Sequence, residues 1–476
     1  MKYAHQNVAF EAVDLKTGRY KVVNRFYFTN LRKYDVNYEL RANGSVAKRG
    51  KVALDVSPQA TAEFVIPVTV TVGKPGVEYF VHFSVVTRQA EPLIPIGHEI
   101  AQEQFRLPLE TEKDSYEASG KALGWKAENG KVVVSSSNVY FELDKATGMV
   151  TSYKVNGTEF FDKAFGVQPN FWRAPNDNDY GNSNPKRLQI WKESSRDFKV
   201  SDTAVREEGE TVLMSVTYDL PAGNQYLITY RIYRDGVVNV NVKFTQTDRE
   251  AEKTEVLEDT NLATFTPGKK VKKKDVLEVP RIGVRFRIPH VMNRVEYFGR
   301  GPVENYVDRN AGSMVGRYKT SVEEMYVNYV RPQENGHRTD TRWVSFTNTV
   351  GRGLLVLAEK TIGFNALQNT VEDFDSEESS HPYQWRNRSP KEVAGKNEAE
   401  AKNVLRRMTH VNDITPRDFV EVCIDMKQQG VAGYDSWGAK VQPGYTIPAN
   451  RDYVWGFTLI PIKNVGDVNK SLRYTY

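Results

Sequence analysis

Alternation of apolar and polar residues, the usual pattern of β-strands, recurs along most of this chain. In residues 237–244, every second residue from Val238 to Phe244 is apolar and the residues between them are polar, which is typical of a strand with one buried face. Residues 226–233 have a similar pattern, and the intervening Arg234-Asp235-Gly236 is a strong tight-turn signal, so we predict a β-hairpin. β-Branched and aromatic residues predict further strands at residues 36–40, 62–72, 77–86, 131–143, 211–218 and 456–462.

Helical periodicity is rare, and only residues 187–198 and 398–408 predict short helices. A (β/α)8 barrel needs eight strand–helix alternations over about 250 residues, and the chain has no such pattern. A Walker loop, a Rossmann glycine fingerprint and a His-Glu-x-x-His zinc helix are also absent from the sequence. The sequence therefore predicts an all-β protein outside these nucleotide-binding and zinc-helix classes.

Turn signals divide the chain into two predicted domains. Residues 1–111 hold several short strands separated by turns such as Asn43-Gly44, and this rhythm suits an immunoglobulin-like β-sandwich. A polar segment at residues 110–117 is the predicted linker. Residues 112–476 show no comparable break, so we expect one large antiparallel β domain of stacked sheets.

Composition and charge indicate which kinds of partner and location to expect for the protein. The formal net charge is only +5 in 476 residues, whereas a dedicated nucleic-acid binder concentrates positive charge. No stretch approaches the length of a membrane span, and the N-terminus lacks the apolar core of a signal peptide. The single cysteine, Cys423, is expected in a strand and can form no internal disulfide. We expect a soluble protein, cytoplasmic or periplasmic, with neither nucleic acid nor a membrane as partner.

Residues 171–181 hold the densest mixture of aromatic and polar side chains in the chain. Three aromatics stand there beside one arginine, two asparagines and two aspartates. An apolar start followed by a turn-rich run predicts a buried strand that ends in a rigid loop. The same residue types suit a sugar site, because a flat ring covers the apolar face of a pyranose and polar groups bond its hydroxyls. A well-capped structural loop explains the composition as well.

A second candidate for sugar binding is the stretch 431–439, where small residues flank Trp437. Such flanks leave the ring room to project and stack on a sugar, although tryptophans more often belong to the core. The two carboxylates of a retaining glycosidase lie about 5–5.5 Å apart, and the 60 acidic residues offer too many pairs to choose one. The histidines are too widely spaced to predict a metal site.

A third cluster lies in residues 297–309. Its glycines predict a tight turn at residues 299–302. Glu304, Asp308 and Arg309 are then candidates for ion pairing. His337, in a neighbouring polar stretch, is either a hydrogen-bonded loop histidine or a catalytic group.

Four segments, in order along the chain, resemble the C-terminal part of the large β-galactosidases of glycoside hydrolase family 2. They are residues 24–31 (NRFYFTNL), 173–181 (RAPNDNDYG), 299–309 (GRGPVENYVDR) with 332–336 (PQENG), and 435–437 (DSW). The resemblance implies the family's fourth, immunoglobulin-like domain at residues 1–111. It implies the fifth domain, a β-supersandwich similar to galactose mutarotase, at residues 112–476. The chain would then be a fragment, in keeping with its abrupt start in a strand-like segment.

The function that this resemblance implies is that of a retaining β-galactosidase, which hydrolyses terminal β-D-galactose from galactosides such as lactose. The family's two catalytic glutamates lie in an upstream (β/α)8 barrel of the same polypeptide. No residue of this chain is therefore expected to be catalytic, and the chain alone is expected to be inactive. Trp437, Asp435, Gly181 and Asp179 are the expected substrate-binding residues. Tyr434 departs from the Gly-Gly-Asp that usually precedes this motif.

The resemblance also bears on cofactors and partners. Family members use magnesium and sodium or potassium, with ligands expected outside this chain, so we expect no cofactor or metal bound by this segment. The expected partners are a galactoside and the upstream catalytic barrel, and the full-length protein is expected to be a homo-oligomer.

Two other functions stay open. The aromatic and polar loops would also suit a stand-alone carbohydrate-binding module. Fold analogy alone suggests an aldose mutarotase or epimerase, whose acid and base would come from His290, His337 and Glu304.

Overall fold

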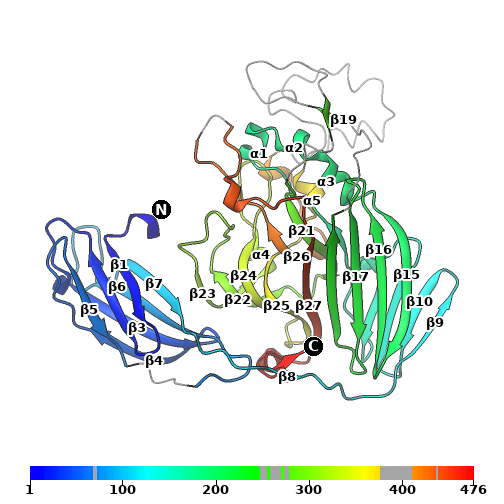
Figure 1. The fold of residues 1–476 in the computed structure, drawn as a ribbon, viewed down its shortest axis with the longest axis horizontal. Helices are drawn as coiled ribbons and strands as arrows, with labels where there is room; N and C mark the ends of the chain where they lie inside the picture. Colours follow the sequence, from blue (N-terminus) through cyan, green and yellow to red (C-terminus); the bar gives the residue numbers. More distant parts are fainter. Residues whose placement is uncertain (68–71, 247–254, 258–269, 273–277, 376–409, 436–437) are drawn as a thin grey trace.

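The computed structural model describes residues 1–67, 72–246, 255–257, 270–272, 278–375, 410–435 and 438–476. In these ranges the strands form antiparallel sheets, apart from one short parallel pair, and the helices are short. The predicted all-β fold is therefore confirmed. Figure 1 shows a smaller N-terminal unit beside a larger unit that holds the rest of the chain.

The N-terminal unit is a sandwich of two sheets. In β3, alternate residues from Tyr34 to Leu40 are buried, so one face of the strand packs inward. Phe10 stacks on Phe83 of the opposite sheet with ring centroids 4.7 Å apart, which joins the sheets in the core. One sheet has the order β1 (Val8–Asp14), β2 (Arg19–Asn24), β5 (Thr61–Val65), and the other the order β4 (Ser45–Val52), β3 (Tyr34–Ala42), β6 (Tyr79–Thr87), β7 (Glu99–Arg106).

The larger unit begins with a five-stranded sheet. The strand predicted at residues 131–143 is wrong in its extent, because the chain turns at residues 136–138 and forms two strands. Ser136 closes this turn, since its backbone nitrogen donates to the Val139 carbonyl at 2.9 Å. The sheet order is β13 (Thr158–Glu159), β12 (Val150–Val155), β11 (Val139–Asp144), β10 (Lys131–Ser135), β9 (Gly124–Glu128).

A second, larger sheet packs against the first. The predicted hairpin is confirmed, because Ile232 of β17 pairs with Val238 of β18 across the turn. Cys423 is buried in β26, as predicted. The main order is β14 (Gln168–Asn170), β21 (Arg281–Pro289), β26 (Phe419–Gln428), β25 (Gly353–Leu367), β27 (Tyr453–Ile462), β18 (Val238–Thr245), β17 (Gln225–Ile232), β16 (Thr211–Asp219), β15 (Lys199–Glu208).

Three further strands extend this sheet as a branch: β22 (Arg294–Gly301) pairs with β23 (Met314–Ser321) and β24 (Arg338–Thr347), and β24 also pairs with β25. The predicted turn at residues 299–302 is wrong, because β22 continues to Gly301. Two small pairs complete the described strands: β19 (Glu255–Leu257) with β20 (Lys270–Lys272), and β8 (Asp114–Ser115) with β28 (Tyr474–Thr475).

Buried tyrosines fasten the two sheets of the larger unit to each other. The hydroxyl of Tyr153, on β12, donates to the Gly236 carbonyl in the β17–β18 turn at 2.5 Å. The hydroxyl of Tyr218, on β16, donates to the Gly148 carbonyl at 2.7 Å. Each ring fills the core while its hydroxyl satisfies a backbone oxygen of the opposite layer.

The described helices are α1 (Asp177–Gly181), α2 (Asn184–Arg187), α3 (Gln189–Ser194), α4 (Val322–Met325), α5 (Val371–Phe374) and α8 (Val468–Ser471). The helix predicted at residues 187–198 is wrong in its bounds, since α2 ends at Arg187 and α3 ends at Ser194. The helix predicted at residues 398–408 lies outside the described residues. Figure 1 places α1, α2, α3 and α5 together at one end of the large sheet. No helix in the described ranges is long and apolar enough to cross a membrane.

Candidate functional site

After β14, residues 171–176 are buried. The chain then forms α1, not the expected rigid loop. Asn176 caps this helix, because its Oδ1 accepts from the Asp179 nitrogen at 2.8 Å. In return, Asp179 Oδ2 accepts from the Asn176 nitrogen at 3.2 Å. This reciprocal pair is a capping box, so part of the polar density serves the start of the helix.

A buried ion pair joins Asp179 to Arg173 beneath α1. Arg173 Nη2 lies 2.8 Å from Asp179 Oδ1, and Arg173 Nε lies 3.1 Å from Oδ2. The side chains are 2% and 1% exposed. Asn184 also donates to Asp179 Oδ1 at 2.8 Å. The Asp179 carboxylate is therefore bonded within the protein and lies below the surface.

The other edge of the Arg173 guanidinium fixes the chain that follows β26. Its Nη1 donates to the Gln429 carbonyl at 2.8 Å and its Nη2 to the Gly430 carbonyl at 3.0 Å. Burial opposes the charge of Arg173, but the nearby Asp179 carboxylate outweighs that effect and raises the pKa of the guanidinium. We call this arrangement of Arg173, Asp179 and the two carbonyls the Arg173 clamp.

Residues 431–435 and 438–439, the described parts of the 431–439 loop, are held against α1. Near its start, Asn178 donates to the Val431 carbonyl at 2.9 Å. Near its end, Asn182 donates to the Ala439 carbonyl at 3.3 Å. Gly438 has a φ of +88°, and a Cβ atom there would lie 2.6 Å from the Gly181 carbonyl oxygen. Glycine is therefore required where the loop meets α1.

Three of the four expected substrate-binding residues come together here. Gly181 contacts Gly438 of the loop, Asp179 anchors α1, and Asp435 lies on the loop itself. Asp435 is exposed, and its Oδ1 accepts from the Ala439 nitrogen at 3.2 Å. Trp437, the fourth, lies outside the described residues.

Arg331 and Asp177, which were not among the expected substrate-binding residues, border this site. Arg331 stacks on the Tyr180 ring with its guanidinium carbon 3.7 Å from the centroid. Its Nη1 lies 3.3 Å from Asp177 Oδ1, and the Asp177 side chain is 71% exposed. Burial raises the pKa of Tyr180 to about 12, so this ring stays neutral. Carboxylate and guanidinium groups on a surface rim can bond sugar hydroxyls.

The expected ion pairing in residues 297–309 is found for two of the three residues. Arg309 Nη2 donates to Glu304 Oε1 at 2.6 Å. Glu304 Oε2 accepts from the Gly336 nitrogen at 2.8 Å. Asp308 instead accepts from the Ala432 nitrogen at 2.9 Å. Its carboxylate thus ties this segment to the start of the 431–439 loop.

The groups considered for an aldose mutarotase do not share an open site. His337 is 1% exposed and stacks on Tyr306. Burial, with Arg281 nearby, holds the pKa of His337 well below its usual range, so its ring is neutral. The Glu304 side chain is 9% exposed. His290 is 44% exposed and lies 3.6 Å from Glu323 at α4 instead.

A buried charge cluster lies under the site. Arg281 Nη2 lies 2.9 Å from Glu334 Oε1, and Arg281 Nε lies 3.2 Å from Asp425 Oδ2. Burial raises the pKa of Asp425 to about 7, against the opposing effect of Arg281. No three His, Cys, Asp or Glu side chains gather as a metal site would need in the part of the chain described.

The fold and these loops define an all-β protein of two units, and its family is given by comparison with known proteins. Residues 135–459 match the family described as β-galactosidase small chain, and residues 20–108 match β-galactosidase domain 4. The chain belongs to the β-galactosidase small chain family.

Curated β-galactosidases are similar along almost the whole chain. That of Priestia megaterium is 31% identical over 97% of this chain and 39% of its own length. That of Streptococcus thermophilus is 27% identical over 97% of this chain and 39% of its own length. The chain thus spans about two fifths of the length of these relatives.

Solved structures share parts of the fold at low similarity. A mutarotase-like protein, YeaD, from Salmonella typhimurium matches with a TM-score of 0.32 and 10% identity over 74% of this chain and 97% of its own. A galactose 1-epimerase from Lactobacillus acidophilus matches with a TM-score of 0.31 and 7% identity over 74% of this chain and 99% of its own.

Proposed function

We propose that this chain is the C-terminal region of a retaining β-galactosidase of glycoside hydrolase family 2. The complete protein would hydrolyse terminal β-D-galactose from β-galactosides such as lactose. This region would bind carbohydrate and complete the active-site pocket. The catalytic glutamates, with the magnesium and sodium or potassium ligands, would lie in the remaining part of the polypeptide.

The observation that carries the proposal is the Arg173 clamp. It joins two segments that are more than 250 residues apart and so fixes the 431–439 loop against α1. The described loop residues on either side of the gap are held against α1, by Asn178 at Val431 and by Asn182 at Ala439. Such preorganisation lowers the entropy lost on binding. Similarity to β-galactosidases over 97% of the chain supports galactose as the sugar.

The proposed chemistry of this region is recognition. An exposed aromatic ring on the loop would cover the apolar face of a sugar ring. Asp435, Asp177 and Arg331 would bond hydroxyl groups from the rim. No proton transfer is assigned to these residues, because retaining hydrolysis needs two carboxyl groups about 5–5.5 Å apart on either side of the scissile bond.

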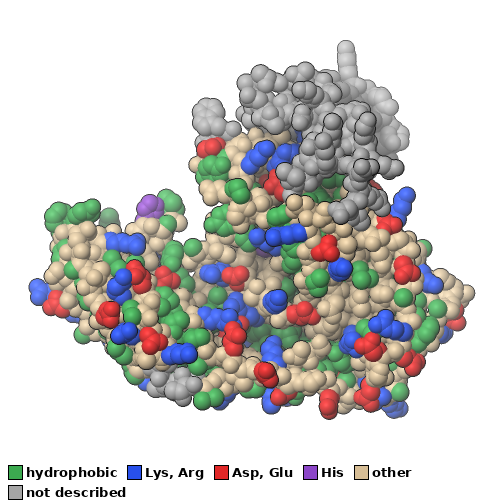
Figure 2. Space-filling view, in the orientation of Figure 1, with side chains coloured by type: hydrophobic (Ala, Val, Ile, Leu, Met, Phe, Trp, Pro, Cys, Tyr) green, Lys and Arg blue, Asp and Glu red, His purple; other side chains and the backbone are tan. Residues whose placement is uncertain are grey.

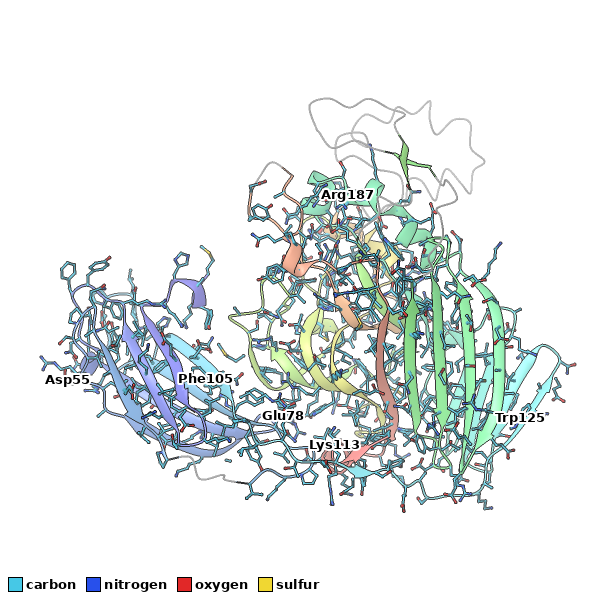
Figure 3. All side chains as sticks on the ribbon, viewed as in Figure 1. Asp55, Glu78, Phe105, Lys113, Trp125 and Arg187 are labelled. Carbon is cyan, nitrogen blue, oxygen red and sulfur yellow. The ribbon has the colours of Figure 1, made fainter. Side chains whose placement is uncertain are left out.

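The test compares Trp437→Ala with Trp125→Ala in the polypeptide that contains this chain and the catalytic barrel. Stacking contributes about 1 kcal/mol, so kcat/KM for a galactoside should fall about fivefold in Trp437→Ala. Trp125 is 40% exposed on β9, at the edge far from the N-terminal unit (Figure 3), and its removal should leave kcat/KM unchanged. Equal effects of the two substitutions would refute the assignment.

A stand-alone carbohydrate-binding module is the competing function. It would bind galactosides in the isolated chain with the affinity of the complete protein. Titration of the isolated chain with a non-hydrolysable thiogalactoside distinguishes the two. Binding as tight as in the complete protein, lost in Trp437→Ala, would favour the module.

A further inference from the structure

The junction between the two units contains a cavity of about 570 Å³. Chain from both units lines it, including Glu78 and Arg106 from the N-terminal unit and Arg342 and Trp343 from β24. Figure 3 labels Glu78 and Lys113 at this junction, and Arg187, at the end of α2, at the opposite end of the larger unit. The junction cavity is therefore separate from the site at α1.

The junction is built as a fixed contact. Gln104 of β7 donates to the Val315 carbonyl of β23 at 2.8 Å and accepts from the Val315 nitrogen at 2.9 Å. Arg342 of β24 donates to Glu78 at 3.0 Å. A Cβ atom on Gly76 would lie 2.0 Å from the Leu472 carbonyl oxygen. These contacts join the two units around the cavity, so the cavity walls are part of the folded structure.

One wall of the junction cavity is apolar. It is formed by Leu107, Phe298, Trp343, Leu357 and Leu472. Trp343 is 1% exposed, and its indole NH has no hydrogen-bond partner within the described residues. This wall suits an apolar or aromatic group.

The rim of the junction cavity is positive. Three carboxylates, Glu78, Glu110 and Glu359, line it beside five Lys and Arg side chains, and two of the three are paired, because Glu78 binds Arg342 at 3.0 Å and Glu110 binds Arg106 at 3.1 Å. Lys74, Lys113 and Lys360 also line the cavity, and none of the three forms an ion pair in the ranges that the structure describes. Figure 2 shows Lys and Arg side chains along the hollow between the units.

We infer that the junction cavity is a binding site for a small organic anion, with an acidic group held by Lys74, Lys113 and Lys360 and an apolar or aromatic body against Phe298 and Trp343. Charge-assisted hydrogen bonds from ammonium groups are the strong contacts in such a site. Burial lowers the pKa of Lys113, and an anion nearby would reverse that effect. Because both units contribute, a bound anion would also stabilise the junction. This inference does not depend on the proposed carbohydrate function.

The experiment titrates the 476-residue chain with phenyl phosphate by isothermal calorimetry and follows its thermal unfolding. We expect saturable binding of one phenyl phosphate per chain and a raised midpoint of thermal unfolding. The double variant Lys113→Gln/Lys360→Gln should weaken binding about a hundredfold or more, since it removes two charge-assisted hydrogen bonds. Lys145→Gln, an exposed lysine between β11 and β12, is the matched control and should bind as the unmodified chain does.

Competing ligands distinguish the contribution of the charged rim of the junction cavity from that of its apolar wall. Inorganic phosphate should bind more weakly than phenyl phosphate, because it lacks the ring that would cover Phe298 and Trp343. Neutral phenyl β-galactoside should not displace phenyl phosphate from the cavity. The inference is overturned if phenyl phosphate does not saturate, or if the double variant binds it as tightly as Lys145→Gln does.

Discussion

At the scale of single residues, Arg173 is the side chain on which the candidate site most depends. It is 2% exposed and bonds one carboxylate and two backbone carbonyls. A guanidinium suits this position because its planar fork offers donors on two edges at once. Removing it would leave Asp179 as a buried charge without its cation.

We predict that Arg173→Met lowers the free energy of unfolding by about 3–5 kcal/mol, because breaking a buried ion pair leaves one charge uncompensated. Urea denaturation measures this. Arg173→Met/Asp179→Asn should recover part of the loss, since it removes that charge. Arg49→Met, whose side chain is 73% exposed, should change stability by less than about 1 kcal/mol. Equal losses at positions 173 and 49 would argue against the clamp.

Asp425 gives the protein a predicted pH response. Its folded pKa is about 7, while an unfolded Asp has a pKa of about 3.9, so the folded state holds this proton more tightly. The stability that it contributes is present below about pH 4 and is lost as the pH rises to 7. His337, with its lowered pKa, has the opposite effect, since the unfolded state takes up that proton below about pH 6.5.

The variant Asp425→Asn isolates the contribution of this carboxylate to the pH dependence of stability. The free energy of unfolding of Asp425→Asn, relative to that of the unmodified chain, should increase as the pH rises from 4 to 7, by at most about 1.4 kcal/mol per pH unit, and then level off. Denaturant unfolding across this range measures the difference. A difference that stays constant with pH would contradict a raised pKa for Asp425.

At the scale of elements, the hairpin β17–β18 shows what a sequence specifies locally. Alternation and an Asp-Gly turn fix both strands, and the structure pairs them as predicted. The break between β10 and β11 escaped prediction because Ser136, Ser137 and Asn138 contain neither glycine nor proline. Helix α1 was missed because its capping residues, Asn176 and Asp179, are the same residue types that form turns.

The candidate site was predictable only in part for a related reason. Residues 171–181 and 431–439 could each be singled out from their composition. Their contact depends on pairings across more than 250 positions, which no local pattern specifies. The substrate-binding roles of Trp437, Asp435, Gly181 and Asp179 stay predictions, as does the domain boundary between residues 111 and 112.

The hydrogen bond from Tyr153 to Gly236, which joins the two sheets of the larger unit, leads to a prediction at the scale of elements. Tyr153→Phe keeps the ring but leaves the Gly236 carbonyl without its 2.5 Å bond. We expect a loss of about 1–3 kcal/mol in unfolding free energy, measured by urea denaturation. Tyr27→Phe, at a side chain that is 75% exposed, is the control and should be neutral. A neutral Tyr153→Phe would mean that the hydroxyl bond adds nothing to the packing.

The contact between Gly438 and Gly181 of α1 leads to another prediction at this scale. Gly438→Ala would strain a residue at φ +88° and push Cβ against the Gly181 carbonyl, at a cost of about 1–3 kcal/mol. The strain should displace the 431–439 loop and raise KM for galactosides in the complete protein. Gly444→Ala, where an added Cβ meets nothing within 4 Å, should leave KM unchanged. An unchanged KM in Gly438→Ala would contradict the role given to the loop.

At the scale of the whole molecule, two β units are joined by hydrogen bonds such as those between Gln104 and Val315, and the candidate site lies at the α1 end of the larger unit (Figure 1). The chain spans 39% of the length of the Priestia megaterium relative. A recognition surface on a stable support is therefore the role that we propose, with bond cleavage assigned to the remaining part of the polypeptide.

Hydrolysis of a chromogenic aryl β-galactoside, with magnesium present, tests this division of labour most directly. It is measured for this chain alone, for the remaining part of the polypeptide alone, and for the two together. We predict turnover only when both parts are present, and a lower kcat/KM when this chain carries Trp437→Ala. Turnover that follows this chain alone through purification would place a catalytic carboxylate pair within its 476 residues and contradict the account.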